Sequence, residues 1–217
     1  MSAWRVNRLV CGIDEVGRGS LAGPVITAAV ILPARKDISV LKDSKILPEN
    51  VRLEAYCWIV KNCWYAVGIV DHLCVDRHNI WNATLISMKK ALMHVLATCP
   101  KLPISILIDA MPLKLNDTSY NSIPVYYFDK GESKSSSIAA ASIVAKVTRD
   151  NLMKKFNSIF PGFFLDAHKG YGTKKHKDVL KENPPLIIHR QSFLNNIDLY
   201  SKQKDKYGKQ QTICGGY

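Results

Sequence analysis

Two short apolar segments of the chain both end in an aspartate, and this feature constrains the fold most. Residues 9–14 read LVCGID and residues 104–109 read ISILID. Each run has the length and composition of a buried β-strand. Functional sites in open α/β sheets lie beyond the carboxyl ends of parallel strands, so Asp14 and Asp109 are expected to meet there if their strands are neighbours. Glu15 follows Asp14 directly and can turn towards the same site at a strand end.

The remaining pattern predicts a single α/β domain. Further strands are expected at residues 24–32, 64–70 and 123–128, and helices near Pro48, at 82–96 and at 135–156. The first three strands would form an antiparallel meander. The strand, helix, strand order that follows predicts a parallel pair with a right-handed crossover. At 217 residues the chain is long enough for one catalytic unit of about 150 residues with a modest appendage.

The clustered carboxylates predict a metal site. Two or three carboxylates in a small volume repel one another unless a divalent cation neutralises them. Oxygen ligands without His or Cys suit Mg²⁺ or Mn²⁺, and two such ions about 4 Å apart can hold the attacking and leaving oxygens of a phosphodiester. Phosphoryl-transfer chemistry is therefore expected at Asp14, Glu15 and Asp109. A turn or a helix cap is the alternative role for any one aspartate at a strand end.

The net charge of +12 favours a polyanionic partner, either nucleic acid or an anionic membrane surface. Residues 129–217 contain 16 Lys and Arg against 8 Asp and Glu, so most of the excess lies in the C-terminal part. A basic surface that serves only solubility is the alternative. No apolar run approaches the roughly 18 residues of a membrane span, and the N-terminus does not resemble a signal peptide. The six cysteines form no C-x-x-C pair, which is typical of free thiols, and a cytoplasmic location without a membrane partner is expected.

Glycines and an aromatic residue stand where a nucleic acid could contact them. Gly17, Arg18 and Gly19 follow the acidic pair and supply backbone N–H groups that can approach a ligand closely, although they could also form only a tight connection to the next strand. Tyr171 lies among basic residues and histidines in the segment 168–176 (HKGYGTKKH) and could stack on a sugar or base. A solvated loop is the alternative for this segment.

Two basic residues of the predicted helix 135–156 are also candidates for contact with nucleic acid. Lys146 and Arg149 are three residues apart, so they share a helix face and could contact consecutive phosphates. Asp150 lies four residues after Lys146, and a solvated, salt-bridged helix face is therefore an equal alternative.

Six blocks of sequence, taken in order, resemble the type 2 ribonucleases H (ribonuclease HII). They are GIDEVGRGSLAGPV at 12–25, DSK at 43–45, LIDA at 107–110, AASIVAKVTRD at 140–150, HKGYGT at 168–173 and HRQSF at 189–193. The resemblance implies a ribonuclease H-like mixed five-stranded sheet flanked by helices, with a small helical C-terminal region. We therefore expect a catalytic core at 1–160, a helical substrate-binding region at 161–200 and a basic, flexible tail at 201–217.

The resemblance also implies four metal-binding carboxylates. Asp14, Glu15 and Asp109 match three of them. For the fourth, the family usually has an aspartate two residues after a lysine, whereas this chain has Glu132 at that place. Glutamate keeps the charge and adds a methylene, which changes its reach and can shift metal preference. Asp129 is the alternative fourth ligand.

Nucleic-acid contacts follow from the same resemblance. Residues 17–19 (GRG) would sense the ribose 2′-hydroxyl at an RNA–DNA junction, with Tyr171 stacking on the adjacent deoxyribose. Gly172 stands where the family commonly has a proline, which would loosen that loop. Backbone phosphates would be held by Lys45, Lys146 and Arg149.

By this similarity the chain is expected to be a metal-dependent endonuclease that uses two Mg²⁺ or Mn²⁺ ions. It would hydrolyse the RNA strand of RNA–DNA hybrids and cut 5′ of ribonucleotides embedded in duplex DNA, leaving 5′-phosphate and 3′-hydroxyl ends. Ribonucleotide excision repair and DNA replication are the implied uses, and a monomer is the expected state. The alternatives are another DNA nuclease of the same fold and a nucleic-acid-binding protein whose activity is impaired by Glu132.

Overall fold

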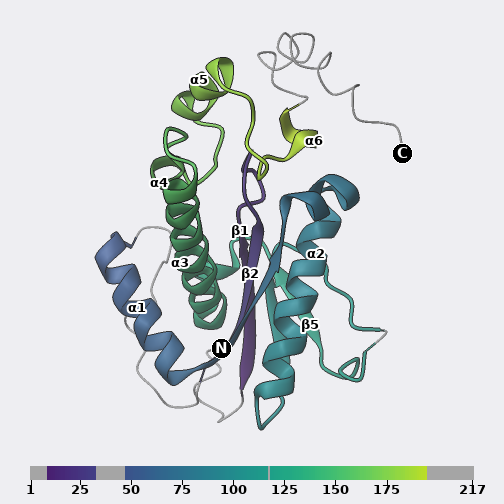
Figure 1. Cartoon of the computed structure of the whole chain (residues 1–217). Coiled ribbons are helices and arrows are strands. Elements are labelled where there is room, and N and C mark those ends of the chain that lie inside the picture. Colours follow the sequence, from purple (N-terminus) through teal and green to yellow (C-terminus); the bar gives the residue numbers. More distant parts are fainter. Residues whose placement is uncertain (1–8, 33–46, 117, 195–217) are drawn as a thin grey trace.

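The computed structural model describes residues 9–32, 47–116 and 118–194, where a five-stranded sheet is flanked by helices (Figure 1). The strands are β1 (Val10–Val16), β2 (Val25–Ile31), β3 (Trp64–Val70), β4 (Ser105–Asp109) and β5 (Val125–Phe128). The helical elements are α1 (Glu49–Asn62), α2 (His72–Thr98), the 3₁₀ helix η3 (Gly131–Ser133), α3 (Ser136–Ile159), α4 (Leu165–His168), α5 (Lys174–Glu182) and α6 (Gln191–Leu194). This mixed sheet with flanking helices is the fold class predicted from the sequence.

The strand order in the sheet is β3-β2-β1-β4-β5. β1 pairs antiparallel with β2, and β2 with β3, so the predicted meander is confirmed. The parallel neighbours are β1 with β4 and β4 with β5. The prediction of a parallel pair across α2 needs correction: β3 and β4 run in the same direction, but β2 and β1 fill the two positions between them.

Helix α2 begins ten residues before the predicted start at residue 82. Asp71 caps it by accepting a hydrogen bond from the Cys74 N–H at 2.8 Å. The helix then breaks at Asn79, which has φ 62° and ψ 166°, and the Asn79 side chain accepts a hydrogen bond from the Asn82 N–H at 3.0 Å. The sequence pattern therefore identified only the part of α2 that follows this second cap.

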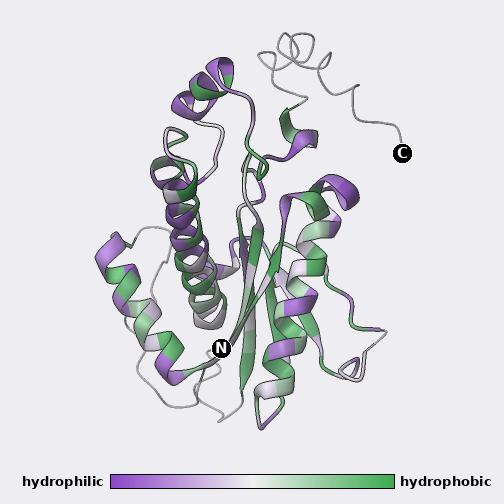
Figure 2. Ribbon diagram, in the orientation of Figure 1, coloured by the Kyte–Doolittle hydropathy of each residue, from purple (hydrophilic) through white to green (hydrophobic). Residues whose placement is uncertain are grey.

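Helices cover both faces of the sheet, with α2 on one face and α1 and α3 on the other (Figure 1). β2 is coloured as hydrophobic along most of its length, whereas the helices carry both hydrophobic and hydrophilic residues (Figure 2). Alternate strand residues point to opposite faces: Ile13 packs in the α2 layer, whereas Gly12 faces α3. A Cβ at Gly12 would lie 2.0 Å from the Ser137 carbonyl carbon, so glycine lets the α3 backbone approach β1.

The segments after α3 pack against the connection between β1 and β2. Their apolar cluster combines Leu21 and Ala22 of that connection, Met153 of α3, and Phe163, Leu165, Leu180, Ile188 and Leu194. Isolated β-bridges join Ser20 to Tyr171 and Ala22 to His189. The division of the chain at residue 160 stays a prediction, and the tail at 201–217 lies outside the described residues.

Three histidines lie buried in this C-terminal region. The rings of His168 and His176 are stacked with centroids 4.1 Å apart, and Nε2 of His176 lies 3.0 Å from Nε2 of His189. Burial, followed by the charge of a neighbouring histidine, lowers the pKa of His176 and of His189 to about 4. These histidines therefore belong to the packing of α4 and α5.

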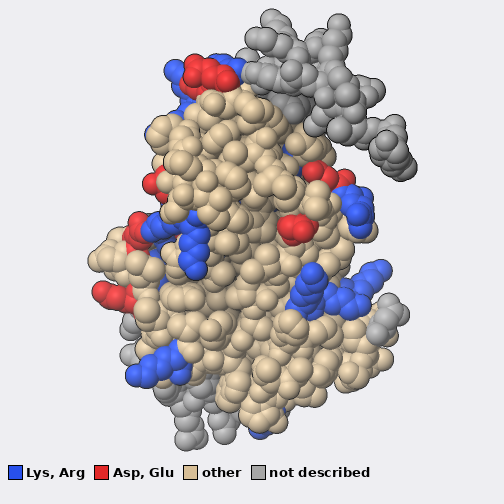
Figure 3. Space-filling model, in the orientation of Figure 1, with Lys and Arg blue, Asp and Glu red and all other residues tan. Residues whose placement is uncertain are grey.

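Charged residues of both signs are intermingled on the face seen in Figure 3. Within the described ranges, no helix is both long and apolar enough to cross a bilayer. Cys11, Cys57, Cys74 and Cys99 are free thiols, as the spacing of the cysteines predicted.

Candidate active site

The register of β1 and β4 brings two predicted carboxylates together. Gly12 pairs with Leu107 and Ile13 with Ile108, and the next step of this parallel register sets Asp14 beside Asp109. Neighbouring strands lie about 4.8 Å apart. Both aspartates lie on the α3 face of the sheet, because each is two residues beyond a residue of that face. The two aspartates therefore lie side by side as the sequence predicted, although β1 continues two residues beyond Asp14 to Val16.

Asp14 is buried in a negatively charged environment. Burial, followed by repulsion from Glu15 and then from Asp109, raises the pKa of Asp14 to about 8 despite a hydrogen bond with Ser142 of α3. The Glu15 N–H donates to Asp14 Oδ1 at 2.8 Å. Without a cation, a large part of the Asp14 population is protonated at neutral pH.

Glu15 lies beside Asp14 and has one oxygen without a partner. Burial raises the pKa of Glu15, and the guanidinium of Arg18 partly offsets this effect. Nη1 of Arg18 lies 3.4 Å from Glu15 Oε1, and the same guanidinium lies 5.8 Å from the ring centroid of Trp81. Glu15 Oε2 is buried and has no hydrogen-bond partner among the described residues.

Glu132 is carried to the same edge of the sheet by η3. The Gly131 N–H donates to Asp109 Oδ1 at 2.8 Å, so the turn that contains Glu132 is tied to the end of β4. Glu132 is only 9% exposed, whereas Asp129 is exposed to solvent. Of the two predicted candidates for the fourth carboxylate, the buried Glu132 lies in the turn that contacts Asp109.

A hollow of about 360 Å³ joins the first two carboxylates to predicted nucleic-acid contacts. It is lined by Asp14, Glu15, Val16, Gly17, Arg18, Gly19, Arg52, Ser142, Lys146 and Tyr171. These residues come from β1, from the connection that follows it, from α1 and α3, and from the segment after α4. Sequence reasoning missed Arg52 and Ser142, because no local pattern marks them and only the packing of α1 and α3 brings them here.

The donor set fits a hard divalent cation in its chemistry. All candidate ligands are carboxylates, which suit Mg²⁺ or Mn²⁺. The unpartnered oxygen of Glu15 and the raised pKa of Asp14 and of Glu15 are features that a cation would relieve. In the part of the chain that is described, no three His, Cys, Asp or Glu side chains stand close enough to surround one ion as they are. Binding an ion here therefore requires the carboxylates to rotate towards it.

The predicted phosphate contact of Arg149 is corrected by its surroundings. The side chain is fully buried. Its Nε donates to the carbonyl oxygen of Pro24 at 3.0 Å, Nη1 to that of Lys169 at 2.8 Å, and Nη2 to Ser20 Oγ at 2.8 Å and to the Ala22 carbonyl at 3.2 Å. A guanidinium held in this way binds the β1–β2 connection from inside and is not presented to a phosphate at the surface.

Lys146, Lys45 and Gly17 were also predicted to contact nucleic acid, and the structure bears on each of them differently. Lys146 lines the hollow and forms an ion pair with Asp150, at 2.9 Å from Nζ to Oδ1, and its contact with phosphates stays a prediction. Lys45 lies outside the described residues. Gly17 has φ +90°, and a Cβ there would lie 2.3 Å from Nε of Arg149, so glycine is required at this position.

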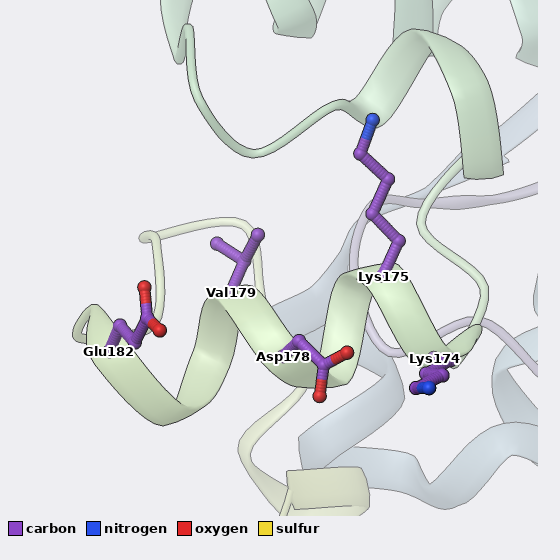
Figure 4. A pocket seen from close by; sticks show the side chains of 5 residues that line it. All are labelled: Lys174, Lys175, Asp178, Val179 and Glu182. Atoms are coloured by element: carbon purple, nitrogen blue, oxygen red, sulfur yellow. The ribbon is translucent and has the colours of Figure 1, made fainter.

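A second hollow of about 480 Å³ lies on the surface of α5 (Figure 4). It is lined by Lys174, Lys175, Asp178, Val179 and Glu182, and none of the four candidate carboxylates borders it. Nζ of Lys175 lies 3.5 Å from the ring centroid of Phe164, and Asp178 pairs with Lys181 at 2.6 Å. Asp178 and Lys175 are thus engaged by neighbouring side chains, and the candidate active site remains the first hollow, which the carboxylates Asp14 and Glu15 line.

Comparison with known proteins identifies the family. Residues 11–196 match the family model described as Ribonuclease HII. The chain belongs to the ribonuclease HII family. Ribonuclease HII of Ligilactobacillus salivarius is 46% identical over 185 residues, which cover 85% of this chain and 69% of that protein. Ribonuclease HII of Caldanaerobacter subterraneus is 43% identical and covers 87% and 75% of the two chains. As a member of this family, the chain is a ribonuclease H and a hydrolase.

Solved structures agree on the fold. Ribonuclease H2 from Pyrococcus horikoshii superposes with a TM-score of 0.72 at 24% identity, covering 93% of this chain and 99% of that one. A ribonuclease HII from Archaeoglobus fulgidus, solved in a complex with PCNA, gives a TM-score of 0.65 at 25% identity, covering 80% and 87%. The ribonuclease H-like fold expected from the sequence is confirmed.

Proposed function

We propose that this chain hydrolyses the RNA strand of RNA–DNA hybrids and cuts on the 5′ side of ribonucleotides embedded in duplex DNA, leaving 5′-phosphate and 3′-hydroxyl ends. The observation that carries the proposal is the set of residues that line one hollow. It combines Asp14 and Glu15 with residues 17–19 and Tyr171, so acidic groups for phosphodiester chemistry lie beside groups suited to recognising a sugar. Membership of the ribonuclease HII family supports the same reading.

Mg²⁺ or Mn²⁺ is the proposed cofactor, and Asp14, Glu15, Asp109 and Glu132 would hold it. When bound, two such ions would activate water for in-line attack and stabilise the leaving 3′ oxygen. Bst-RNase HIII, which has a similar fold at a TM-score of 0.67 and 20% identity, has been solved in complex with Mn²⁺. The clustered carboxylates of this chain supply the negative charge that attracts such ions.

The remaining residues of the hollow would bind and orient the substrate. The backbone N–H groups of residues 17–19 can approach a ribose closely, and a 2′-hydroxyl is the group that distinguishes RNA from DNA. Tyr171 lines the same hollow, and its ring would stack on the adjacent sugar. Arg18 and Lys146 line the hollow and would attract backbone phosphates.

A cleavage-position map tests the proposal. The substrates are a DNA duplex with one ribonucleotide, a long RNA–DNA hybrid and an all-DNA duplex, each incubated with Mg²⁺ or Mn²⁺. We expect one cut, 5′ of the single ribonucleotide, cuts along the RNA strand of the hybrid and none in the all-DNA duplex. Asp14→Asn and Glu132→Gln should abolish or strongly reduce cleavage. Lys154→Ala, which changes an exposed residue of α3 paired with Glu49, is the matched control and should cut like the wild type.

Two results would overturn the proposal. Cleavage of the all-DNA duplex at positions independent of the ribose would indicate a DNA nuclease of the same fold. Binding of the hybrid without cleavage in either metal would indicate a nucleic-acid-binding protein impaired by Glu132.

We also propose that residues 161–200 act as the substrate-binding region, that the protein is a monomer and that it works in the cytoplasm. Tyr171, which reaches the hollow from this region, supports the first statement. Light scattering after size exclusion would test the second, with a mass near 24.3 kDa as the expected result.

A further inference from the structure

We propose that Arg149 and Arg190 are positioning residues that hold the loop of residues 17–24 against the segment that carries Tyr171, and that this arrangement sets the preference for a single embedded ribonucleotide. The inference rests on the proposed function, because it names what aligns the groups assigned to ribose recognition. Neither arginine lines the hollow itself, so each acts through the residues it holds.

Arg149 connects two segments that are far apart in the chain. On one side it donates to oxygens of Ser20, Ala22 and Pro24, all in the loop. On the other side it donates to the Lys169 carbonyl at 2.8 Å, two residues before Tyr171. The guanidinium also lies 5.3 Å from the ring centroid of Tyr171. One side chain therefore fixes the loop, the Tyr171 backbone and the position of the ring together.

Arg190 holds the same loop from the other end. Its Nε and Nη2 both donate to the Gly23 carbonyl, at 3.1 and 2.9 Å, and Nη1 donates to the Arg18 carbonyl at 2.8 Å. The backbone N–H of Arg190 adds a hydrogen bond to the Leu21 carbonyl at 2.8 Å. The contact with Arg18 is direct evidence that Arg190 sets the position of the GRG segment.

The charge of these two arginines is not matched by carboxylates. Neither guanidinium forms an ion pair within the described ranges, and both are fully buried. Burial, followed by the charge of Arg149, lowers the pKa of Arg190 to about 9. Burying a charge without an ion pair costs free energy, so the positive charge by itself does not account for two buried arginines here. What an apolar residue cannot supply is several N–H donors in a planar fork that bind separate carbonyl oxygens.

The two held segments touch backbone to backbone. Leu21 N–H donates to the Gly170 carbonyl at 2.8 Å, and a Cβ at Gly170 would lie 2.4 Å from the Ala22 carbonyl oxygen. A shift of the loop therefore shifts Tyr171 as well. A duplex with one ribonucleotide offers a single register in which the ribose meets residues 17–19 while the next sugar meets Tyr171. A long hybrid offers a 2′-hydroxyl at every register, so it depends less on this alignment.

The test compares kcat/KM for a duplex with one ribonucleotide with kcat/KM for a long hybrid. Arg149→Lys and Arg190→Lys keep the positive charge and lose the fork of donors, and Ser20→Ala removes one acceptor of Arg149 without touching either charge. We expect the ratio of the two kcat/KM values to fall about tenfold in each lysine variant, the effect of losing one charge-assisted hydrogen bond. Ser20→Ala should lower the ratio by about threefold, as for an ordinary hydrogen bond.

Lys154→Ala on the same helix is the control, and its ratio should equal that of the wild type. A ratio that is unchanged in the lysine variants, whether both activities fall equally or neither falls, would overturn the inference. If both lysine variants fail to fold in thermal unfolding, the ratio of Ser20→Ala decides, and an unchanged value rejects the inference. Failure of the proposed function is a separate result, because the wild type would then either cut neither substrate or cut an all-DNA duplex as well.

Discussion

Replacing Asp14 by asparagine should stabilise the metal-free protein while it abolishes cleavage. The pKa of this carboxyl is raised from 3.8 to about 8, with burial as the largest cause and the charges of Glu15 and Asp109 adding to it. A carboxyl with a raised folded-state pKa contributes its full stability below the unfolded value of 3.8 and loses it as the pH rises towards 8. Asn carries no charge and still offers an oxygen to the Glu15 N–H.

The size of the effect follows from the pKa. Each pH unit between the unfolded and folded values costs about 1.4 kcal/mol, so about 4 kcal/mol is lost between pH 3.8 and pH 7. Burying the polar amide costs about 2 kcal/mol in turn. The expected net gain of Asp14→Asn at pH 7 is therefore about 2 kcal/mol in the free energy of unfolding. For a protein of this size it corresponds to a rise of about 4–8 °C in Tm.

Thermal unfolding in a chelator, at pH 4 and pH 7, measures this gain. We expect the gain at pH 7, and at pH 4, where the wild-type carboxyl is protonated in the folded state, we expect the variant to be less stable by about 2 kcal/mol, the cost of the buried amide. Mn²⁺ at ten times its Kd should then stabilise the wild type by about 1.4 kcal/mol and leave Asp14→Asn almost unchanged.

Asp178→Asn is the control, because Asp178 is an exposed carboxylate whose hydrogen bond with Lys181 lowers its pKa. This variant should show no gain at pH 7. The reasoning is refuted if Asp14→Asn is less stable than the wild type in chelator at pH 7, or if Mn²⁺ stabilises both proteins equally.

Three further predictions concern other parts of the molecule. Gly17→Ala combines a positive φ with a Cβ 2.3 Å from Nε of Arg149, so it should cost about 2–4 kcal/mol in thermal unfolding; a loss below about 0.5 kcal/mol would contradict this reading. Burial lowers the pKa of His176 and His189 to about 4, below the unfolded value of 6.5, so their contribution to stability is complete above pH 6.5 and lost as the pH falls towards 4. Hydrogen exchange, corrected for its intrinsic pH dependence, should show that the backbone amides of α5 become less protected as the pH falls from 6.5 towards 4. Unchanged protection would show that these histidines do not contribute to stability in this way. Glu132→Gln should reduce the rate of cleavage by about 100-fold or more, which exceeds the usual effect of mutating a residue that only hydrogen-bonds to a metal ligand. Glu132→Asp should keep activity and alter the ratio of the cleavage rates in Mg²⁺ and Mn²⁺. Wild-type activity in the glutamine variant would exclude Glu132 as a ligand.

Much of the sheet could be predicted because its signal is local. The run WYAVGIV gave β3 its observed bounds, Trp64–Val70, since β-branched and aromatic residues occupy five of its seven positions next to a helix end. The proximity of Asp14 and Asp109 could be predicted for the same reason, because a carboxylate that follows a short apolar run is visible in a short window, although β1 continues two residues beyond Asp14. The first part of α2 was missed because residues 72–81 carry no regular apolar stripe, and its caps depend on side-chain contacts that a pattern does not show.

The sequence by itself determined the strands, the acidic residues and the family, because residue type and short-range periodicity carry that information. Only the tertiary structure decided the role of the arginines. Arg149 lies on a helix face with Lys146 and looked like a phosphate ligand, but three of its four partner residues are 125 or more residues away in the loop after β1, and the side-chain partners of Arg190 are 167 or more residues away in the same loop. Whether a guanidinium faces solvent or carbonyl oxygens depends on which distant segments pack around it, and no local pattern encodes that choice.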